Sequence, residues 1–366
     1  MTEKARHPDW IMVGTILMIL ILGVVMVYSS SSIWSEYKFD DPLYYAKRQI
    51  LFAVFGLIGM YVFTNVSYHV WQKHAKWIVI VCAIFLVLVL VPGVGMVRGG
   101  ARSWIGVGVF SIQPSEFMKL GLILFLARYL SLYQKNIQSF QKGFLPVLTI
   151  VFVPFIIIML QPDLGTGVVL VGTSMTMVLV AGARLLHFSW IGLAGLLGFA
   201  ALIISAPYRI KRITAFLNPW EDPLGSGFQI IQSLYAIGPG GLLGMGLGES
   251  MQKFFYLPEP QTDFIFAVLA EELGFIGGAC VLILFFLLCW RGIRTAIHAP
   301  DLYGTLLALG IVGMITIQVM INVSVVTGLI PVTGITLPLI SYGGSSLTLT
   351  LASLGILLNI SRHTVR

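Results

Sequence analysis

The chain has 366 residues, of which 57% are hydrophobic and only 10% are charged. A soluble domain carries about 25% charged residues, so this composition cannot cover a water-facing surface. The net charge of +7 does not indicate nucleic acid binding, because the basic residues are scattered singly between apolar runs. Anionic lipid headgroups or phosphate-bearing lipid substrates fit the charge better. The composition predicts one polytopic membrane domain over residues 1–366, and its three cysteines, all in apolar runs, indicate neither disulfides nor a metal site.

Ten apolar segments are long enough to cross a bilayer as helices of roughly 20 residues. They begin near Trp10, Arg48, Lys76, Ser115, Phe144, Thr166, Leu186, Asp263, Tyr303 and Leu337. The first segment follows Lys4 and Arg6 as a signal peptide would, but it is long enough to span and is interpreted as an uncleaved helix. The predicted fold is therefore an all-α integral membrane protein with about ten transmembrane helices.

The distribution of charge among the loops predicts the orientation of the chain. With the N-terminus inside, the inner segments hold most of the basic residues and few of the acidic ones. Both termini are therefore predicted to be cytoplasmic. The segment 207–262, between the seventh and eighth spans, is then extracellular, and it is far longer than a connection needs, which indicates a function on the outer face.

Arg102 and Trp104 lie in a glycine-rich outer loop between the third and fourth spans. The fork of an arginine suits bidentate phosphate binding. A tryptophan at the membrane interface either stacks on a sugar ring or anchors in headgroups. A snorkelling arginine and an interfacial tryptophan explain the pair equally well.

Glu116 and Lys119 open the fourth span, three residues apart and on roughly the same helix face. An ionisable residue inside an apolar span is a functional candidate, because charge is costly in hydrocarbon. The alternative is a structural ion pair that holds the helix end. Asp163 has a similar ambiguity before the sixth span, since it is either a substrate contact or a helix cap.

The large outer loop carries a short basic cluster at Arg209, Lys211 and Arg212. These side chains either hold an amphipathic segment against headgroups or donate to a pyrophosphate. The glycines of the loop match no nucleotide-binding fingerprint.

Asp263 follows the rigid segment 258–260 and opens the eighth span, so its backbone is well fixed. Glu271 lies about 12 Å further along a helix, too far for the close carboxylate pair of a hydrolase. A single carboxylate fits a transferase in which one base takes a proton from an incoming hydroxyl. The alternative is again a helix cap.

The stretch 328–346 interrupts apolar sequence with Pro331, Pro338, Gly343 and Gly344. Non-helical backbone at membrane depth is tolerated where it is buried in protein or lines a wet cavity. This stretch therefore predicts a substrate cleft, or equally a transport pathway. Ser345 at its end is a further candidate for substrate contact.

Five motifs, in order along the chain, resemble the SEDS family of RodA, FtsW and SpoVE. They are Arg102-Ser-Trp104, Gln113-Pro-Ser-Glu116 with Lys119, Gln161-Pro-Asp-Leu-Gly-Thr166, Pro258-Glu-Pro-Gln-Thr-Asp263, and the stretch from Pro331 to Ser346. The resemblance runs nearly end to end and includes the ten spans. Short termini and the loops 37–41 and 218–222 resemble the sporulation branch of the family.

The resemblance implies an inverting peptidoglycan glycosyltransferase that acts on lipid II at the outer face of a bacterial cytoplasmic membrane. Asp263 would take the proton from the 4-hydroxyl of the acceptor sugar, and that oxygen would attack the anomeric carbon at the lipid-linked end of the growing chain. Undecaprenyl pyrophosphate would leave, its charge stabilised by basic side chains: Arg102, Lys119, and Arg48 or Arg209. A divalent cation, Mg²⁺ or Mn²⁺, is compatible with this step, although no ligand cluster in the sequence demands one.

The family also implies partners: lipid II and undecaprenyl carriers, the membrane itself, and a class B penicillin-binding protein of the SpoVD type that supplies transpeptidation. A sporulation role would place the chain in forespore or mother-cell membranes. Two rival functions are a lipid II flippase and a non-catalytic scaffold for the penicillin-binding protein. Transporters concentrate charge near the bilayer midplane, whereas Arg102, Asp163 and Asp263 lie near the outer surface, which favours outer-leaflet chemistry.

Overall fold

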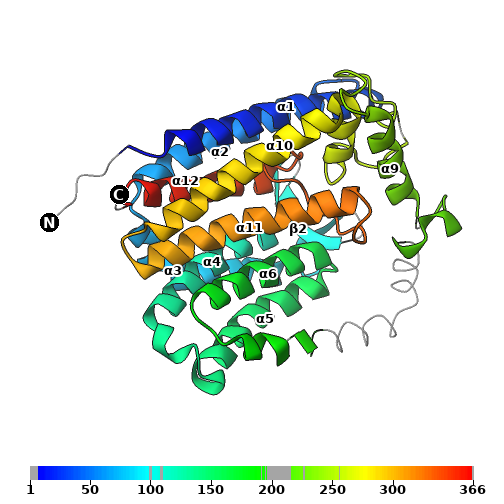
Figure 1. Cartoon of the computed structure of the whole chain (residues 1–366). Helices are drawn as coiled ribbons and strands as arrows, with labels where there is room; N and C mark the ends of the chain where they lie inside the picture. Colours follow the sequence, from blue (N-terminus) through cyan, green and yellow to red (C-terminus); the bar gives the residue numbers. More distant parts are fainter. Residues whose placement is uncertain are drawn as a thin grey trace.

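The computed structural model describes residues 7–98, 101–107, 110–190, 192–193, 195, 216–225, 227–254 and 256–364. Its main feature is a bundle of long apolar helices that lie roughly side by side (Figure 1). These helices are α1 (Trp10–Phe39), α2 (Tyr44–Asn65), α3 (Tyr68–Leu88), α4 (Pro114–Leu132), α5 (Leu145–Leu160), α6 (Leu164–Val180), α10 (Ile265–Ile297), α11 (Leu302–Val326) and α12 (Gly344–Ser361). A helix satisfies its backbone polar groups internally, which is the condition for crossing hydrocarbon. α11 and α12 are mostly enclosed by the bundle, whereas α3 is mostly exposed on its outside.

The predicted helical membrane fold is confirmed. Within the described residues, seven helices are long and apolar enough to cross a membrane, and α6 is a shorter apolar helix. α4 has 19 residues and carries three charged side chains, Glu116, Lys119 and Arg128. The seventh predicted span, from Leu186, falls largely outside the described residues, so the count of ten stays a prediction.

Two predicted spans begin at other residues than expected. The third begins at Tyr68 rather than near Lys76, because the chain turns within residues 66–67 and its polar segment is already helical. The last begins at Gly344 rather than near Leu337, because the backbone of residues 331–337 is not helical. A proline lacks an N–H and disfavours helix in the residue before it, so the two prolines of this stretch delay the helix.

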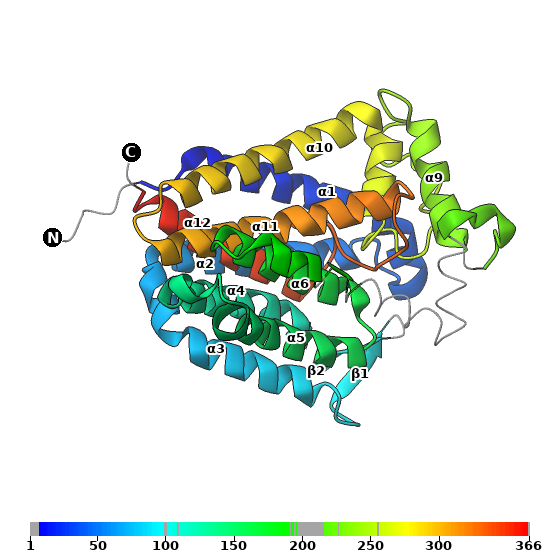
Figure 2. The same cartoon turned by 60° about the horizontal axis from the view of Figure 1, so that its bottom comes forward.

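The beginning of α1 and the end of α12 lie together at one end of the bundle (Figures 1 and 2). The N–H of Asp9 donates to Ser361 Oγ at 3.2 Å, and the Asp9 carboxylate pairs with Arg291 of α10 at 2.5 Å. Arg128 and Arg362 donate to backbone carbonyls of neighbouring helices at the same end. Three of the basic residues expected on the inner side, Arg128, Arg291 and Arg362, therefore lie at one end, and the cytoplasmic location of that end stays a prediction.

The opposite end carries elements that the all-α prediction did not include. They are an antiparallel sheet of β1 (Gly95–Arg98), β2 (Ala101–Val107) and β3 (Phe110–Ile112), and the helix α9 (Phe228–Gly240). The described residues also include three short turns of 3-10 or π helix elsewhere along the chain, namely Gln134–Asn136, Phe140–Phe144 and Pro219–Glu221. The strands are short, and their pairing depends on a partner strand that periodicity does not reveal.

α10 is broken near its outer end, at Gly274, whose φ of +66° and ψ of −167° are not helical. The break exposes backbone groups that the loop after α9 satisfies. Before the break, the backbone N–H groups of residues 245 and 246 donate to the carbonyls of Glu271 and Glu272, both at 3.0 Å. After the break, the N–H groups of residues 275 and 276 donate to the carbonyls of residues 241 and 242. The outer loop is thereby joined to α10 through backbone hydrogen bonds.

Candidate active site at the outer end of the bundle

Asp263 lies at the end of the bundle opposite Asp9, one residue before Phe264, which is the N-cap of α10. No side chain caps this helix. The Asp263 carboxylate instead accepts a hydrogen bond from the Thr262 hydroxyl at 2.6 Å. The helix-cap alternative for Asp263 is therefore wrong, and the carboxylate has no role in starting the helix.

The backbone around Asp263 is held by buried polar side chains. The amide of Asn322, which is 1% exposed on α11, donates to the carbonyl of Asp263 at 2.7 Å and to that of Ile335 at 2.8 Å. The Ser341 hydroxyl donates to the carbonyl of Thr262 at 2.6 Å. The non-helical stretch that precedes α12 therefore lies against Asp263 and fixes its position.

Two carboxylates share this loop. Burial raises the pKa of Asp263, and the hydrogen bond from Thr262 opposes that rise. Desolvation and the neighbouring Asp263 raise the pKa of Glu259, whose Oε2 lies 3.4 Å from the Thr262 hydroxyl. A carboxylate with a raised pKa is a better proton acceptor than an ordinary one, because an efficient general base has a pKa nearer the working pH.

A second polar cluster joins the start of α4 to the start of α6. Lys119, 3% exposed, pairs with Glu116 at 2.7 Å. Gln113 Nε2 donates to Asp163 Oδ2 at 3.0 Å, and Asp163 Oδ1 accepts from the N–H of Thr166 at 3.1 Å. Burial raises the pKa of Asp163. The structural alternatives are both confirmed, because Glu116 and Lys119 form an ion pair and Asp163 caps α6. The cluster nevertheless contains a buried cation, Lys119, and two acids.

One non-helical segment, residues 333–335, adjoins both clusters. A Cβ added to Gly165, two residues after Asp163, would lie 2.6 Å from the carbonyl oxygen of Thr333. A Cβ added to Gly334 would lie 3.9 Å from Asp263 Oδ2. The segment is thus a wall shared by the start of α6 and the loop of Asp263.

Several buried polar atoms around this wall have no hydrogen-bond partner among the described residues. They are Gln49 Oε1, Gln261 Oε1, Asn322 Oδ1, Thr333 Oγ1 and Ser345 Oγ. Buried polar groups are normally paired, since leaving one unpaired is costly. This concentration is typical of a site that receives a polar ligand.

The other predicted site residues that the structure describes lie on α2, β2 and α12. Arg48 is on α2, with its guanidinium carbon 4.1 Å from the centroid of the Tyr44 ring. Arg102 is exposed and Trp104 half-buried on β2, which contacts α4. Ser345 is buried in the first turn of α12. Arg209 lies outside the described residues.

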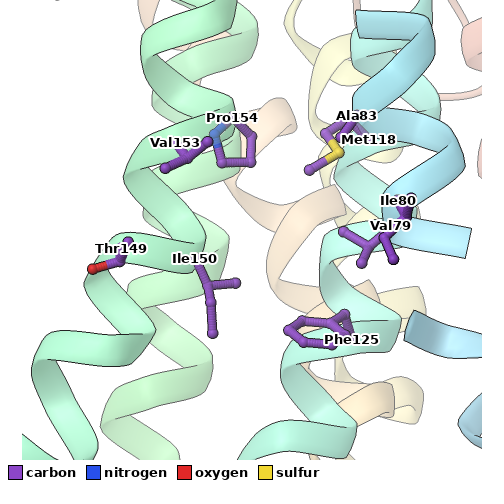
Figure 3. A pocket seen from close by; sticks show the side chains of 9 residues that line it. All are labelled: Val79, Ile80, Ala83, Met118, Phe125, Thr149, Ile150, Val153 and Pro154. Carbon is purple, nitrogen blue, oxygen red and sulfur yellow. The ribbon is translucent and has the colours of Figure 1, made fainter. Parts of the chain in front are cut away.

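The apolar pocket between α3, α4 and α5 is not this site (Figure 3). It has a volume of about 270 Å³ and is lined by Val79, Ile80, Ala83, Met118, Phe125, Thr149, Ile150, Val153 and Pro154. None of these side chains ionises in the physiological range, so the pocket offers no acid, base or phosphate ligand.

No group of three or more His, Cys, Asp or Glu side chains suited to a metal ion occurs within the described residues. Glu259 and Asp263 are two carboxylates of one loop, and a cation between them would need further oxygen ligands from a bound phosphate. The expectation about Mg²⁺ or Mn²⁺ stays a prediction.

A buried charge cluster anchors the outer loop behind the site. Glu272 is fully buried and lies 2.6 Å from the Ser29 hydroxyl of α1 and 3.3 Å from Lys253 Nζ. Glu271, also fully buried, accepts from the Ser250 hydroxyl at 2.5 Å. The carboxylates therefore hold residues 250–253 against the broken part of α10, and Glu271 is not a partner of Asp263, as expected.

Sequence reasoning missed Glu259, Thr262, Asn322 and Ser341 as parts of the site. Asn322 could have been found, because it follows Gln318 by one helical turn inside an otherwise apolar span, and such polar side chains are expensive in a membrane. Glu259 has a left-handed φ of +46° between two prolines. Strained backbone of this kind clusters at functional sites, but only the structure reveals it.

The family of cell cycle proteins that comprises FtsW, RodA and SpoVE matches residues 9–366. The chain is 66% identical over 364 residues to stage V sporulation protein E of Bacillus subtilis, with complete coverage of both chains. It is 44% identical over 359 residues to the probable peptidoglycan glycosyltransferase FtsW of a Geobacter species, covering 98% of each.

Solved structures show the same relationship. The fold is similar to that of the rod shape determining protein RodA of Thermus thermophilus, with a TM-score of 0.73, 31% identity and 98% of each chain covered. It is also similar to a chain in a peptidoglycan synthase complex described as coordinating polymerization and crosslinking, with a TM-score of 0.79 and 34% identity over 97% of this chain and 98% of that one. The chain belongs to the FtsW, RodA and SpoVE family.

Proposed function

We propose that the chain is a peptidoglycan glycosyltransferase that polymerises lipid II at the outer face of the cytoplasmic membrane. Relatives along its whole length are named as such enzymes, and its fold is that of RodA. The observation that carries the proposal is the state of Asp263. Its carboxylate has a raised pKa, does not cap α10, and lies against the non-helical segment that precedes α12.

In the proposed reaction Asp263 takes the proton of the acceptor hydroxyl as that oxygen attacks the anomeric carbon of the donor. The new C–O bond forms on the face opposite the breaking bond to the pyrophosphate, so the configuration inverts. The leaving pyrophosphate takes the electron pair of the broken bond. Lys119, which pairs with Glu116 in the first turns of α4, would stabilise that charge. A divalent cation would supply further charge stabilisation at the phosphates.

We also propose a class B penicillin-binding protein of the SpoVD type as the partner, and a role in spore formation. The similar chain in a peptidoglycan synthase complex supports such a partner, and the identity of 66% with stage V sporulation protein E supports the sporulation role. The multi-pass membrane location follows from the apolar helices. The same proposal includes lipid II as the substrate, undecaprenyl lipids as its carriers, and forespore or mother-cell membranes as the location.

The test is polymer formation from lipid II by the full chain purified with its penicillin-binding partner. Wild type is compared with Asp263→Ala and with Asp41→Asn as the control. Asp41 lies in the loop between α1 and α2 and pairs with Lys47 of α2. We expect polymer from wild type and Asp41→Asn, and a loss of about 10²- to 10⁴-fold in Asp263→Ala, the usual contribution of a general base. Equal polymer from all three would remove Asp263 from the mechanism. Transfer of lipid II across liposomes without any polymer would support a flippase instead.

A further inference from the structure

An aromatic cluster lies beside the Asp263 loop, where the junction of α1 and α2 meets the stretch before α12. Its members are Trp34 and Phe39 of α1, Tyr44 and Tyr45 of α2, and Tyr342 of the stretch before α12. The rings of Phe39 and Tyr44 are stacked with centroids 3.7 Å apart, and those of Tyr45 and Tyr342 meet edge to face at 4.8 Å. Tyr45 is also hydrogen-bonded to Trp34. Four of the rings are therefore in mutual contact, and Trp34 joins them through Tyr45.

The cluster is connected directly to the reactive loop. The N–H of Tyr342 donates to the carbonyl of Gln261 at 2.8 Å, two residues before Asp263. Glu259 lies within electrostatic range of Tyr45 and of Lys38, and the Lys38 ammonium lies 5.8 Å from the ring centroid of Trp34. Aromatic rings, a carboxylate and an ammonium therefore adjoin the loop of Asp263.

The aromatic cluster and the Lys119 cluster differ in chemistry in a way that matches the two substrates of a glycosyl transfer. The donor breaks its bond to a pyrophosphate, so its subsite needs a cation that meets growing negative charge. The acceptor presents an uncharged sugar ring and one hydroxyl. Lys119 provides the first kind of subsite, and the aromatic cluster with Glu259 provides the second.

Resting on the proposed function, in which Lys119 meets the pyrophosphate of the donor, we propose that the aromatic cluster and Glu259 bind the saccharide of the acceptor. The apolar C–H face of a sugar packs on an aromatic ring, and a carboxylate accepts hydrogen bonds from its hydroxyls. Rings of an interfacial belt anchor in headgroups at the membrane surface. The mutual contacts of this cluster and its hydrogen bond to the loop of Asp263 favour a sugar site over a belt.

The test measures binding of two probes to the full chain in lipid nanodiscs. The probes are a soluble, lipid-free tetrasaccharide of alternating N-acetylglucosamine and N-acetylmuramic acid, and inorganic pyrophosphate. The variants are Trp34→Ala, Trp34→Phe and Lys119→Met, with Trp77→Ala as a matched control, because Trp77 is an exposed tryptophan on α3. Asp263→Ala as the background prevents turnover from altering the probes.

We expect Trp34→Ala to weaken tetrasaccharide binding at least tenfold and to leave pyrophosphate binding unchanged. Trp34→Phe should restore most of the binding, because a ring is kept. Lys119→Met should weaken pyrophosphate binding and leave tetrasaccharide binding unchanged. Trp77→Ala should bind both probes as the parent protein does. If Trp34→Ala fails to fold, as judged by thermal unfolding, Glu259→Gln tests the same subsite and should also weaken the tetrasaccharide alone about tenfold.

The proposal is overturned if the parent protein shows no saturable binding of the tetrasaccharide, or if Trp34→Ala and Trp77→Ala weaken it equally. It is also overturned if Trp34→Ala or Glu259→Gln weakens pyrophosphate as much as the sugar. Polymer formation by the wild type, measured in parallel, separates the two proposals. If the wild type forms polymer but the tetrasaccharide does not bind selectively, only the acceptor-site proposal is rejected. If the tetrasaccharide binds selectively but no polymer forms, the proposed glycosyltransferase function is rejected.

Discussion

The side-chain amide of Asn322 donates to the carbonyl oxygens of both Asp263 and Ile335, at 2.7 and 2.8 Å. One buried group on α11 thus joins the loop of the proposed base to the non-helical segment that precedes α12. The position of Asp263 therefore depends on a residue 59 positions away in the sequence.

Replacing Asn322 by alanine should lower both stability and rate. The change leaves two buried carbonyls without their donor, which costs about 1–3 kcal/mol. Thermal unfolding and polymer formation measure the two effects. Asn65→Ala is the control, because Asn65 is exposed at the inner end of α2. An Asn322→Ala protein with wild-type stability and rate would show that Asp263 is held without this contact.

The rate of polymer formation should depend on pH through Asp263. A general base acts when deprotonated, and burial raises the pKa of Asp263 above the ordinary range of an aspartate. The acid limb of kcat/KM should therefore lie above that range, with the rate rising as pH increases through it. Thr262→Val removes the hydrogen bond that lowers this pKa, so its acid limb should move to higher pH.

The control for this profile is Thr149→Val, whose hydroxyl bonds only within α5, at 3.2 Å to the carbonyl of Leu145. Its acid limb should coincide with that of the wild type. A Thr262→Val limb that moves to lower pH, or does not move, would contradict the assignment of that limb to Asp263.

The contribution of the Lys119–Glu116 pair to stability can be separated from its contribution to the reaction rate. Lys119→Met leaves a carboxylate that is 10% exposed without its cation, and breaking a buried pair costs about 3–5 kcal/mol. Adding Glu116→Gln removes that unpaired charge, so the double variant should regain most of the melting temperature. Its rate of polymer formation should stay low, because the cation for the pyrophosphate is missing. Full recovery of both stability and rate would leave the pair a purely structural role.

The break in α10 should be sensitive to a single methyl group. Gly274 has a φ of +66°, and a Cβ there would lie 2.3 Å from the N atom of Gly244. Gly274→Ala therefore forces residues 242–244 away from α10 and adds about 1–3 kcal/mol of strain, because this backbone region is essentially restricted to glycine. The melting temperature should fall by several degrees. Gly59→Ala in α2 has no atom within 4 Å of its new Cβ and should be neutral or slightly stabilising. Equal melting temperatures for the two variants would show that the break tolerates a side chain.

The apolar spans and the candidate carboxylates were readable from the chain because they depend on local properties. A long apolar run must form a helix in hydrocarbon, whatever its neighbours are. Asp263 was identifiable because it stands between a proline-rich segment and such a run, and Lys119 because it is charged inside one. The same local reasoning left the capping alternative open for both Asp163 and Asp263, and geometry decided it differently for each.

What the tertiary structure alone decided is which of these residues meet. Asn322 and Asp263 are 59 positions apart, and Tyr45 and Tyr342 come from opposite ends of the chain. The sheet β1–β3, the break at Gly274 and the segment 333–335 beside both clusters also depend on partners far along the sequence. Hydrophobic periodicity reports the face that a segment buries but not the segment that covers it, so such long-range contacts become visible only when the helices are packed.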